Sequence, residues 1–140
     1  MKMIDTNIIA YAYDEFEIKK REKCKDLIGR AFNENIEFCV TNQILGELFN
    51  TLTENFRKPV SVENAEIIVN SIIDSDNWLK INYSYKTVGR AISLFKKYKV
   101  HFWDALIAAT MIENDISVIY TENEKDFKKI PGLEIVNPLA

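Results

Sequence analysis

The sequence predicts an α/β fold in which helices cover both faces of a central parallel sheet. Its 140 residues suit one compact domain, and 47% apolar with 28% charged residues is an ordinary globular balance. Short β-rich runs alternate with helical patterns along the chain, which favours parallel strands. No linker, repeat or shift in composition divides the sequence, so we expect a single domain over residues 1–140.

The N-terminal part contains two predicted strands and two predicted helices. Residues 1–4 form a short apolar run that predicts a buried strand. Residues 16–32 carry scattered apolar positions among many charges, which is typical of a mostly solvated helix. Residues 37–41 are short and β-rich, so we expect a strand. Apolar spacings of three and four predict a helix over 42–56, which Pro59 ends.

The central part continues the alternation. Ser61 is a suitable N-cap for a helix over 62–74, whose apolar positions form one stripe. Residues 78–81 predict a strand, and residues 84–98 again show helical spacing. The segment 102–114 is apolar on nearly every side, so we expect a helix buried against the sheet.

Two further short strands are predicted near the C-terminus, over residues 117–120 and 133–136. The Pro131-Gly132 step between them marks a turn.

Composition excludes several kinds of protein. No apolar run approaches the roughly 18–20 residues that span a bilayer, and no signal peptide is recognisable, so we expect a cytoplasmic protein. Cys24 and Cys39 fit neither a disulfide framework nor a zinc cluster, and the single histidine, His101, is expected to pack or cap. A net charge of −3 argues against a protein that coats nucleic acid, although it does not exclude a nuclease.

Acidic residues stand where burial predicts none. Asp5 follows the first strand, and ligands of parallel sheets bind at the carboxyl ends of strands. Asp104 begins the most apolar helix, where an ionised carboxylate needs a cation, hydrogen bonds or the helix N-terminus to offset its desolvation. For both residues the alternative is simple helix capping. Helical periodicity places Glu47 near solvent and does not select it.

The loop after the strand at 117–120 adds Glu122, Glu124 and Asp126 to the same predicted edge of the sheet, although a solvated acidic turn is the alternative for each of them. Carboxylates that converge there repel one another unless divalent cations neutralise them. All-oxygen ligands suit Mg²⁺ or Mn²⁺ rather than Zn²⁺.

Several motifs in order resemble the PIN domain family and, more narrowly, the VapC-type toxins of prokaryotic toxin–antitoxin pairs. They are MIDTN, GELFN, FWDALIAATM, IYTENEKDF and IPGLEIVNP, and they span essentially the whole chain. The resemblance implies a three-layer α/β/α domain and Mg²⁺- or Mn²⁺-dependent endoribonuclease activity. It also implies a homodimer, an RNA substrate and an inhibitory antitoxin partner.

The resemblance assigns the first three acids of the family to Asp5, Glu47 and Asp104. Asp5 and Asp104 are then expected to bind the principal ion, with Glu47 contacting it through water or holding a second ion. Thr6 and Asn7 are expected to support the first carboxylate, and the Thr6 hydroxyl to position water or phosphate.

The fourth position departs from the family pattern. Family members often carry an acid where Asn123 stands, and Asn123 offers a neutral carbonyl oxygen as a metal ligand. Asp126 is the preferred acidic substitute, with Glu122 next. The departure also keeps open a non-catalytic PIN-like module that binds RNA or supports an assembly.

Two other classes also start with a carboxylate at a strand end. A haloacid dehalogenase-type phosphatase needs a second aspartate two residues after the first, where Asn7 stands. A receiver-like signalling domain needs paired acids after its first strand, where Asp5 stands alone.

Overall fold

The structure is a computed structural model that describes residues 1–35 and 37–140. Its five strands form one parallel sheet in the order β3-β2-β1-β4-β5, so β1 lies at the centre. The strands are β1 (Lys2–Ile4), β2 (Phe38–Thr41), β3 (Trp78–Ile81), β4 (Val118–Tyr120) and β5 (Glu134–Val136).

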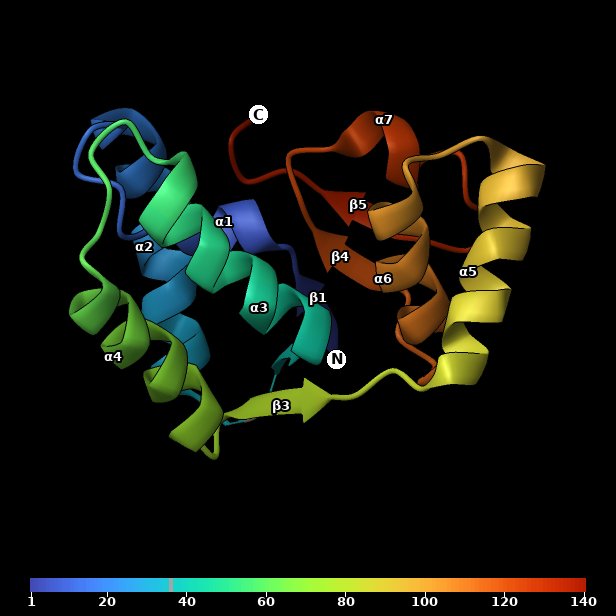
Figure 1. Cartoon of the computed structure of the whole chain (residues 1–140), viewed down its shortest axis with the longest axis horizontal. Coiled ribbons are helices and arrows are strands. Elements are labelled where there is room, and N and C mark those ends of the chain that lie inside the picture. The colour runs from blue at the N-terminus through green and yellow to red at the C-terminus, as the bar shows by residue number, and fades with distance from the viewer. Residues whose placement is uncertain (36) are drawn as a thin grey trace.

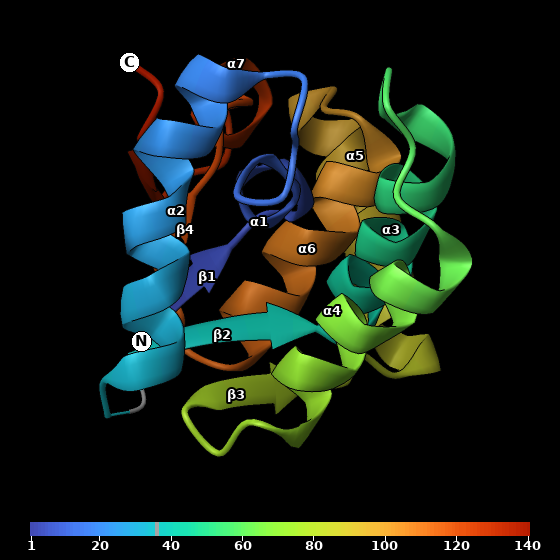
Figure 2. The same cartoon turned by 90° about the vertical axis from the view of Figure 1, so that its left-hand side faces the viewer.

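Helices lie on both sides of this sheet, as expected. Figure 1 shows α1 to α4 on the left of the molecule and α5 to α7 on the right, with β1 and β4 between them. In the view turned by 90°, α2 and α6 again lie on opposite sides of β1 (Figure 2). The helices are α1 (Thr6–Tyr11), α2 (Ile18–Asn33), α3 (Asn42–Asn50), the π-helix η1 (Thr51–Asn55), α4 (Val62–Asp74), α5 (Tyr85–Tyr98), α6 (Phe102–Glu113) and α7 (Glu124–Phe127).

The hydrophobic core is built around β1 and α6. Met3 and Ile4 of β1 are fully buried, and every residue of α6 from Ala105 to Met111 is buried. The prediction of a helix buried on nearly all sides is thereby confirmed. Burial of each large apolar side chain contributes roughly 1.5–3 kcal/mol. None of the described helices is long and apolar enough to cross a membrane.

Three local predictions differ from the structure. The residues after Asp5 form the short helix α1, where no element was predicted: Asp5 caps it by accepting a hydrogen bond from the Thr6 backbone, and Ile8 and Ile9 bury the next turn. The helix expected over 42–56 is α-helical only to Asn50, then π-helical; apolar spacing does not distinguish these two windings. The acidic loop contains α7, with Asn123 as its N-cap.

The direction of the strands places three chain segments at one edge of the sheet. β2, β1 and β4 are neighbours and parallel, so their carboxyl ends at Thr41, Ile4 and Tyr120 lie along the same edge. Asp5 and Thr121 directly follow two of these ends, and α3 follows the third. Side chains far apart in the sequence therefore converge there.

Candidate metal centre

Asp5 is fixed at the centre of the carboxyl edge by three hydrogen bonds. Its backbone N–H donates to the Tyr120 carbonyl at 2.9 Å, its Oδ1 accepts from the Thr6 N–H at 2.8 Å, and its Oδ2 accepts from the Thr121 hydroxyl at 2.7 Å. Burial raises the pKa of Asp5, and the donors Thr121 and Thr6 offset part of that rise. Asp5 is thus the N-cap of α1, and its burial disfavours the ionised form of its carboxyl group.

Asp104 lies in the first turn of α6, where the helix dipole favours negative charge. Burial nevertheless raises the pKa of Asp104 to about 7, with repulsion from Asp5, Asp126 and Glu47 adding to the effect. Asp5, Asp126 and Glu47 thus act on the charge of Asp104, although burial has the larger effect. That Asp5 and Asp104 share one metal ion stays a prediction.

Glu47 projects from α3 toward the same group of acids. Its side chain is half-buried rather than solvated, and burial followed by repulsion from Asp5 raises its pKa. The periodicity-based placement near solvent is wrong, because the polar edge of α3 faces the N-terminus of α6 instead of water. Gln43 makes this link, since its Nε2 donates to Glu47 Oε1 at 2.9 Å and to the Trp103 carbonyl at 3.0 Å.

The loop between β4 and α7 contains the residues expected at the fourth position. Asn123 Nδ2 donates to Asp104 Oδ2 at 2.6 Å and lies 3.5 Å from Asp126 Oδ2, while Asn123 Oδ1 accepts from the Asp126 N–H. Asp126 also accepts from the His101 N–H at 3.3 Å. The amide of Asn123 therefore stands between two carboxylates and donates to both.

Glu122 points to a different set of partners. Its Oε1 accepts from the Tyr11 hydroxyl at 2.6 Å and from Asn7 Nδ2 at 3.5 Å, and Lys20 lies 4.0 Å from Oε2. Its charge still raises the pKa of Asp5. Of the two acids considered for the fourth position, Asp126 is the one bonded beside Asp104.

The Thr6 side chain contributes to the site differently from its backbone. The Thr6 N–H donates to the capping carboxylate of Asp5, whereas the Thr6 hydroxyl is buried and has no hydrogen-bond partner among the described residues. The Asn7 amide reaches Glu122 rather than Asp5. A role for the Thr6 hydroxyl in positioning water or phosphate stays a prediction.

The donor set fits a hard divalent cation. Carboxylates and an amide oxygen are the ligands that Mg²⁺ and Mn²⁺ prefer. Burial is the main cause of the raised pKa values of Asp104 and Glu47, and repulsion from neighbouring acids adds to it. Among residues 1–35 and 37–140, no three His, Cys, Asp or Glu side chains are grouped closely enough to enclose an ion. To enclose an ion these side chains would have to move closer together, and Asn123 would have to turn its oxygen toward Asp104 to serve as a ligand.

Two supporting residues were not anticipated from the sequence. Thr121 follows β4, which pairs with β1, so strand order alone would have placed it beside Asp5. Gln43 stands four residues before Glu47, a spacing that brings two side chains together on one helix face. Both signals depend on first knowing which carboxylates matter.

Fold and site together define a small parallel α/β domain whose carboxylates gather at the carboxyl ends of its central strands. A model of the PIN domain matches residues 2–133. The chain therefore belongs to the PIN domain family. No curated protein matched the sequence.

Solved structures of toxin–antitoxin proteins share the fold. VapC20 of Mycobacterium tuberculosis, described as a toxin that cleaves the sarcin-ricin loop, is 17% identical with a TM-score of 0.72, covering 91% of this chain and 94% of that chain. A toxin–antitoxin complex from Klebsiella pneumoniae is 21% identical with a TM-score of 0.65, covering 99% and 98%. VapBC2 from Rickettsia felis, bound to a promoter DNA fragment, is 23% identical with a TM-score of 0.66, covering 97% of each chain.

Proposed function

We propose that the protein is a Mg²⁺- or Mn²⁺-dependent endoribonuclease and the toxin of a type II toxin–antitoxin pair. The observation that carries this proposal is that the loop after β4 bonds two acids at one sheet edge: Thr121 donates to Asp5, and Asn123 donates to Asp104. Membership of the PIN domain family supports it, as does the fold shared with a toxin described as cleaving RNA.

The proposed roles in binding an ion differ from residue to residue. Asp5 and Asp104 would be its direct ligands, with Asn123 adding a neutral oxygen and Glu47 contacting it through water or holding a second ion. Thr121 and Gln43 hold Asp5 and Glu47 in place. A divalent cation supplies an acidified water for attack on phosphorus and neutralises charge in the transition state. No protein nucleophile is needed.

Cleavage of RNA is the direct test. Mixed cellular RNA is incubated with the protein and Mg²⁺ or Mn²⁺, with and without chelator, alongside Asp5→Asn, Asp104→Asn and the exposed control Asp74→Asn. We expect cleavage that needs the metal, that is lost in the first two variants and that is retained in the third. Asn can replace Asp as the cap of α1, so loss in Asp5→Asn would not reflect loss of that helix.

A non-catalytic PIN-like module that binds RNA or supports an assembly is the second candidate. The observation that favours it is Asn123, which occupies the fourth position without charge and bridges Asp104 and Asp126. RNA binding without cleavage under any divalent ion would support this candidate and reject the enzyme. Formation of an acyl-phosphate on Asp5 would instead indicate a phosphatase or receiver.

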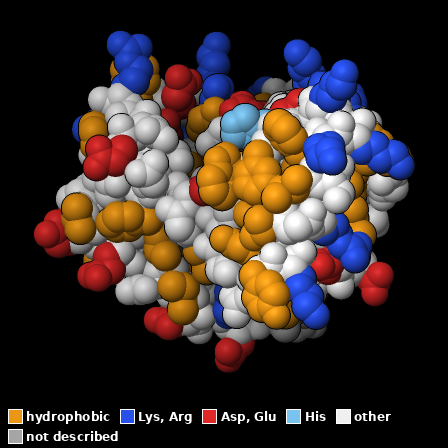
Figure 3. All heavy atoms as spheres, turned by 45° about the vertical axis from the view of Figure 1, so that its right-hand side comes forward, with side chains coloured by type: hydrophobic (Ala, Val, Ile, Leu, Met, Phe, Trp, Pro, Cys, Tyr) orange, Lys and Arg blue, Asp and Glu red, His pale blue; other side chains and the backbone are white. Residues whose placement is uncertain are grey.

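We further propose that the protein forms a homodimer. We also propose that it acts in the cytoplasm, where its RNA substrate is found, and that an antitoxin inhibits it. α5 and α6 pack along each other and expose Ile92, Phe95 and Trp103. Figure 3 shows apolar side chains gathered beside the histidine on this face. A second copy would bury this surface, and light scattering of wild type and Phe95→Glu tests it: the variant should be monomeric.

Solved relatives include complexes with antitoxins, so co-purification with the product of a neighbouring gene tests that partner.

A further inference from the structure

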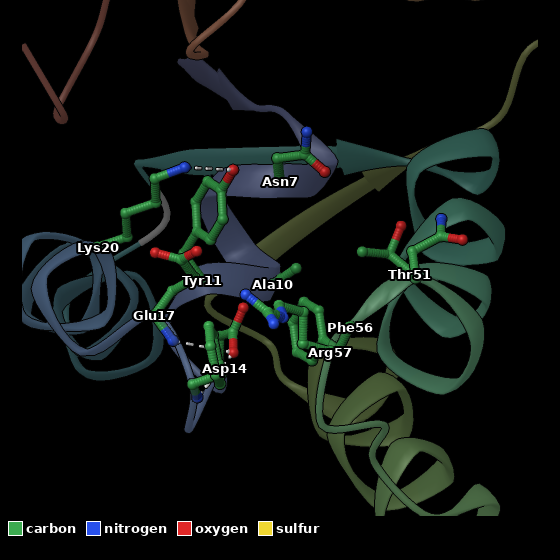
Figure 4. A pocket seen from close by; sticks show the side chains of 11 residues that line it. Asn7, Ala10, Tyr11, Asp14, Glu17, Lys20, Thr51, Phe56 and Arg57 are labelled. Atoms are coloured by element: carbon green, nitrogen blue, oxygen red, sulfur yellow. Dashed lines mark hydrogen bonds between the residues drawn. The ribbon is translucent and has the colours of Figure 1, made fainter.

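A pocket of about 330 Å³ opens between α1, the start of α2 and η1 (Figure 4). Its volume is at the lower end of the range found for ligand sites, about 300–1,000 Å³, which suits one planar ring system with its sugar. The residues that matter for its chemistry are Asn7, Tyr11, Phe16, Thr51, Asn55 and Arg57.

The pocket shares a wall with the candidate metal centre. Asn7, two residues after Asp5, lines the pocket and places its Nδ2 3.5 Å from Glu122 Oε1. Tyr11 also lines it and donates to the same carboxylate at 2.6 Å. Glu122 follows Thr121, the residue that donates to Asp5. The pocket is therefore adjacent to the loop that holds Asp5.

The mouth of the pocket offers a flat cationic surface. The Arg57 guanidinium carbon lies 4.4 Å from the centroid of the Phe16 ring, and both side chains are exposed. Arg57 forms no ion pair with any residue that the structure describes. Arginine planes and aromatic rings are the surfaces on which unpaired RNA bases stack, and a free guanidinium also attracts phosphate.

The other lining residues can form hydrogen bonds with the edge of a base. Asn7 and Asn55 provide amides with both donors and acceptors, and Thr51 provides a hydroxyl. The acid on the floor, Asp14, is buried and already accepts from the Phe16 and Glu17 N–H groups at 3.0 and 3.3 Å. The pocket thus has neutral hydrogen-bonding groups beside a stacking surface, and its lining also includes Glu17 and Lys20.

We propose that this pocket binds one unpaired nucleotide of the RNA, next to the phosphodiester held at the acids, and that it contributes to the choice of cleavage site. The inference deepens the proposed function and rests on it for the cleaved bond. An unpaired nucleotide is required because bases within an RNA duplex do not present a face for stacking on Arg57.

Binding is measured first without cleavage. Fluorescence anisotropy follows a labelled, short single-stranded RNA on the Asp5→Asn protein, alone and combined with Arg57→Ala or Asn55→Ala. Arg90→Ala is the matched control, because Arg90 is an exposed arginine on α5. We expect Arg57→Ala to weaken binding by about 5- to 100-fold, the range for loss of one stacked base. Arg90→Ala should change it by no more than about twofold.

Cleavage is then compared in proteins with Asp5 intact, using RNAs that vary each base beside the cut bond. Arg57→Ala should raise KM with little change in kcat, and Asn55→Ala should flatten the preference for one base. Unchanged RNA affinity and base preference in both variants would overturn the proposal and leave the pocket to a protein segment. If wild type cuts no RNA yet Arg57→Ala still weakens binding, the enzyme proposal fails and the nucleotide pocket stands.

Discussion

Replacing Asp104 by asparagine should change how the stability of the metal-free protein depends on pH. The pKa of Asp104 is raised from 3.8 to about 7, so the folded protein holds a proton that the unfolded chain has already lost. Whenever the folded state binds more protons, the free energy of unfolding falls as pH rises. Asp104 therefore stabilises the metal-free protein fully only below about pH 4, and this contribution is lost as pH rises through about 7.

The expected size follows from the same pKa. Each pH unit within that window is worth about 1.4 kcal/mol, so moving from pH 5 to pH 8 removes at most about 3 kcal/mol from the free energy of unfolding. A divalent cation binds the ionised carboxylate, so adding Mn²⁺ at pH 8 should restore stability. The asparagine side chain of Asp104→Asn has no proton to lose, and this variant should lack this part of the pH slope.

Urea unfolding at pH 5 and pH 8, in chelator and then in excess Mn²⁺, measures these differences. Asp74→Asn is the control, since Asp74 is exposed at the end of α4 and should keep the wild-type slope. Equal pH slopes for wild type and Asp104→Asn would show that Asp104 is not held among interacting carboxylates. The reasoning that leads from its pKa to a metal centre would then be refuted.

Three further substitutions test the supporting contacts. Gln43→Leu removes the donor that joins α3 to the start of α6, so the Mn²⁺ dissociation constant measured by calorimetry should rise about 10-fold while the thermal midpoint changes little. Thr121→Val removes a donor to Asp5, which raises the pKa of that carboxyl further, so the pH at which Mn²⁺ binding is half-complete should move upward. Asn123→Asp adds a charge beside Asp104, so unfolding in chelator at pH 8 should need less urea and Mn²⁺ should bind more tightly. Unchanged Mn²⁺ binding in all three would mean that these contacts do not support an ion.

The sequence predicted best those elements whose boundaries are set by local chemistry. α4 begins after Ser61, whose hydroxyl accepts from the Asn64 N–H at 3.1 Å, and it spans the predicted residues. β3 also has its predicted bounds. The short helices α1 and α7 were not predicted, because a single turn shows no periodicity and each depends on one capping side chain, Asp5 or Asn123.

The candidate site could be predicted only in part, for a related reason. Asp5 and Asp104 stand out because carboxylates interrupt apolar segments, a signal that is local in the sequence. Glu47 lies on a helix flank that looks solvated until another helix approaches it, and only the fold brings Trp103 there. The resemblance to a family supplied what periodicity could not.

Asn123 contacts both the candidate metal centre and the first turn of α7, so cation binding at the one would affect the other. Its oxygen begins α7 by accepting the Asp126 N–H, while its nitrogen serves Asp104. If the amide turned its oxygen toward a cation, the Asn123 Nδ2 group would face the Asp126 N–H, and both are donors. The first turn of α7 would then lose the hydrogen bond that caps it. The same turn is bonded to the C-terminal segment, because Glu124 accepts a hydrogen bond from Asn137, which follows β5. Amide exchange near the C-terminus should therefore report whether a cation is bound at the opposite end of the loop.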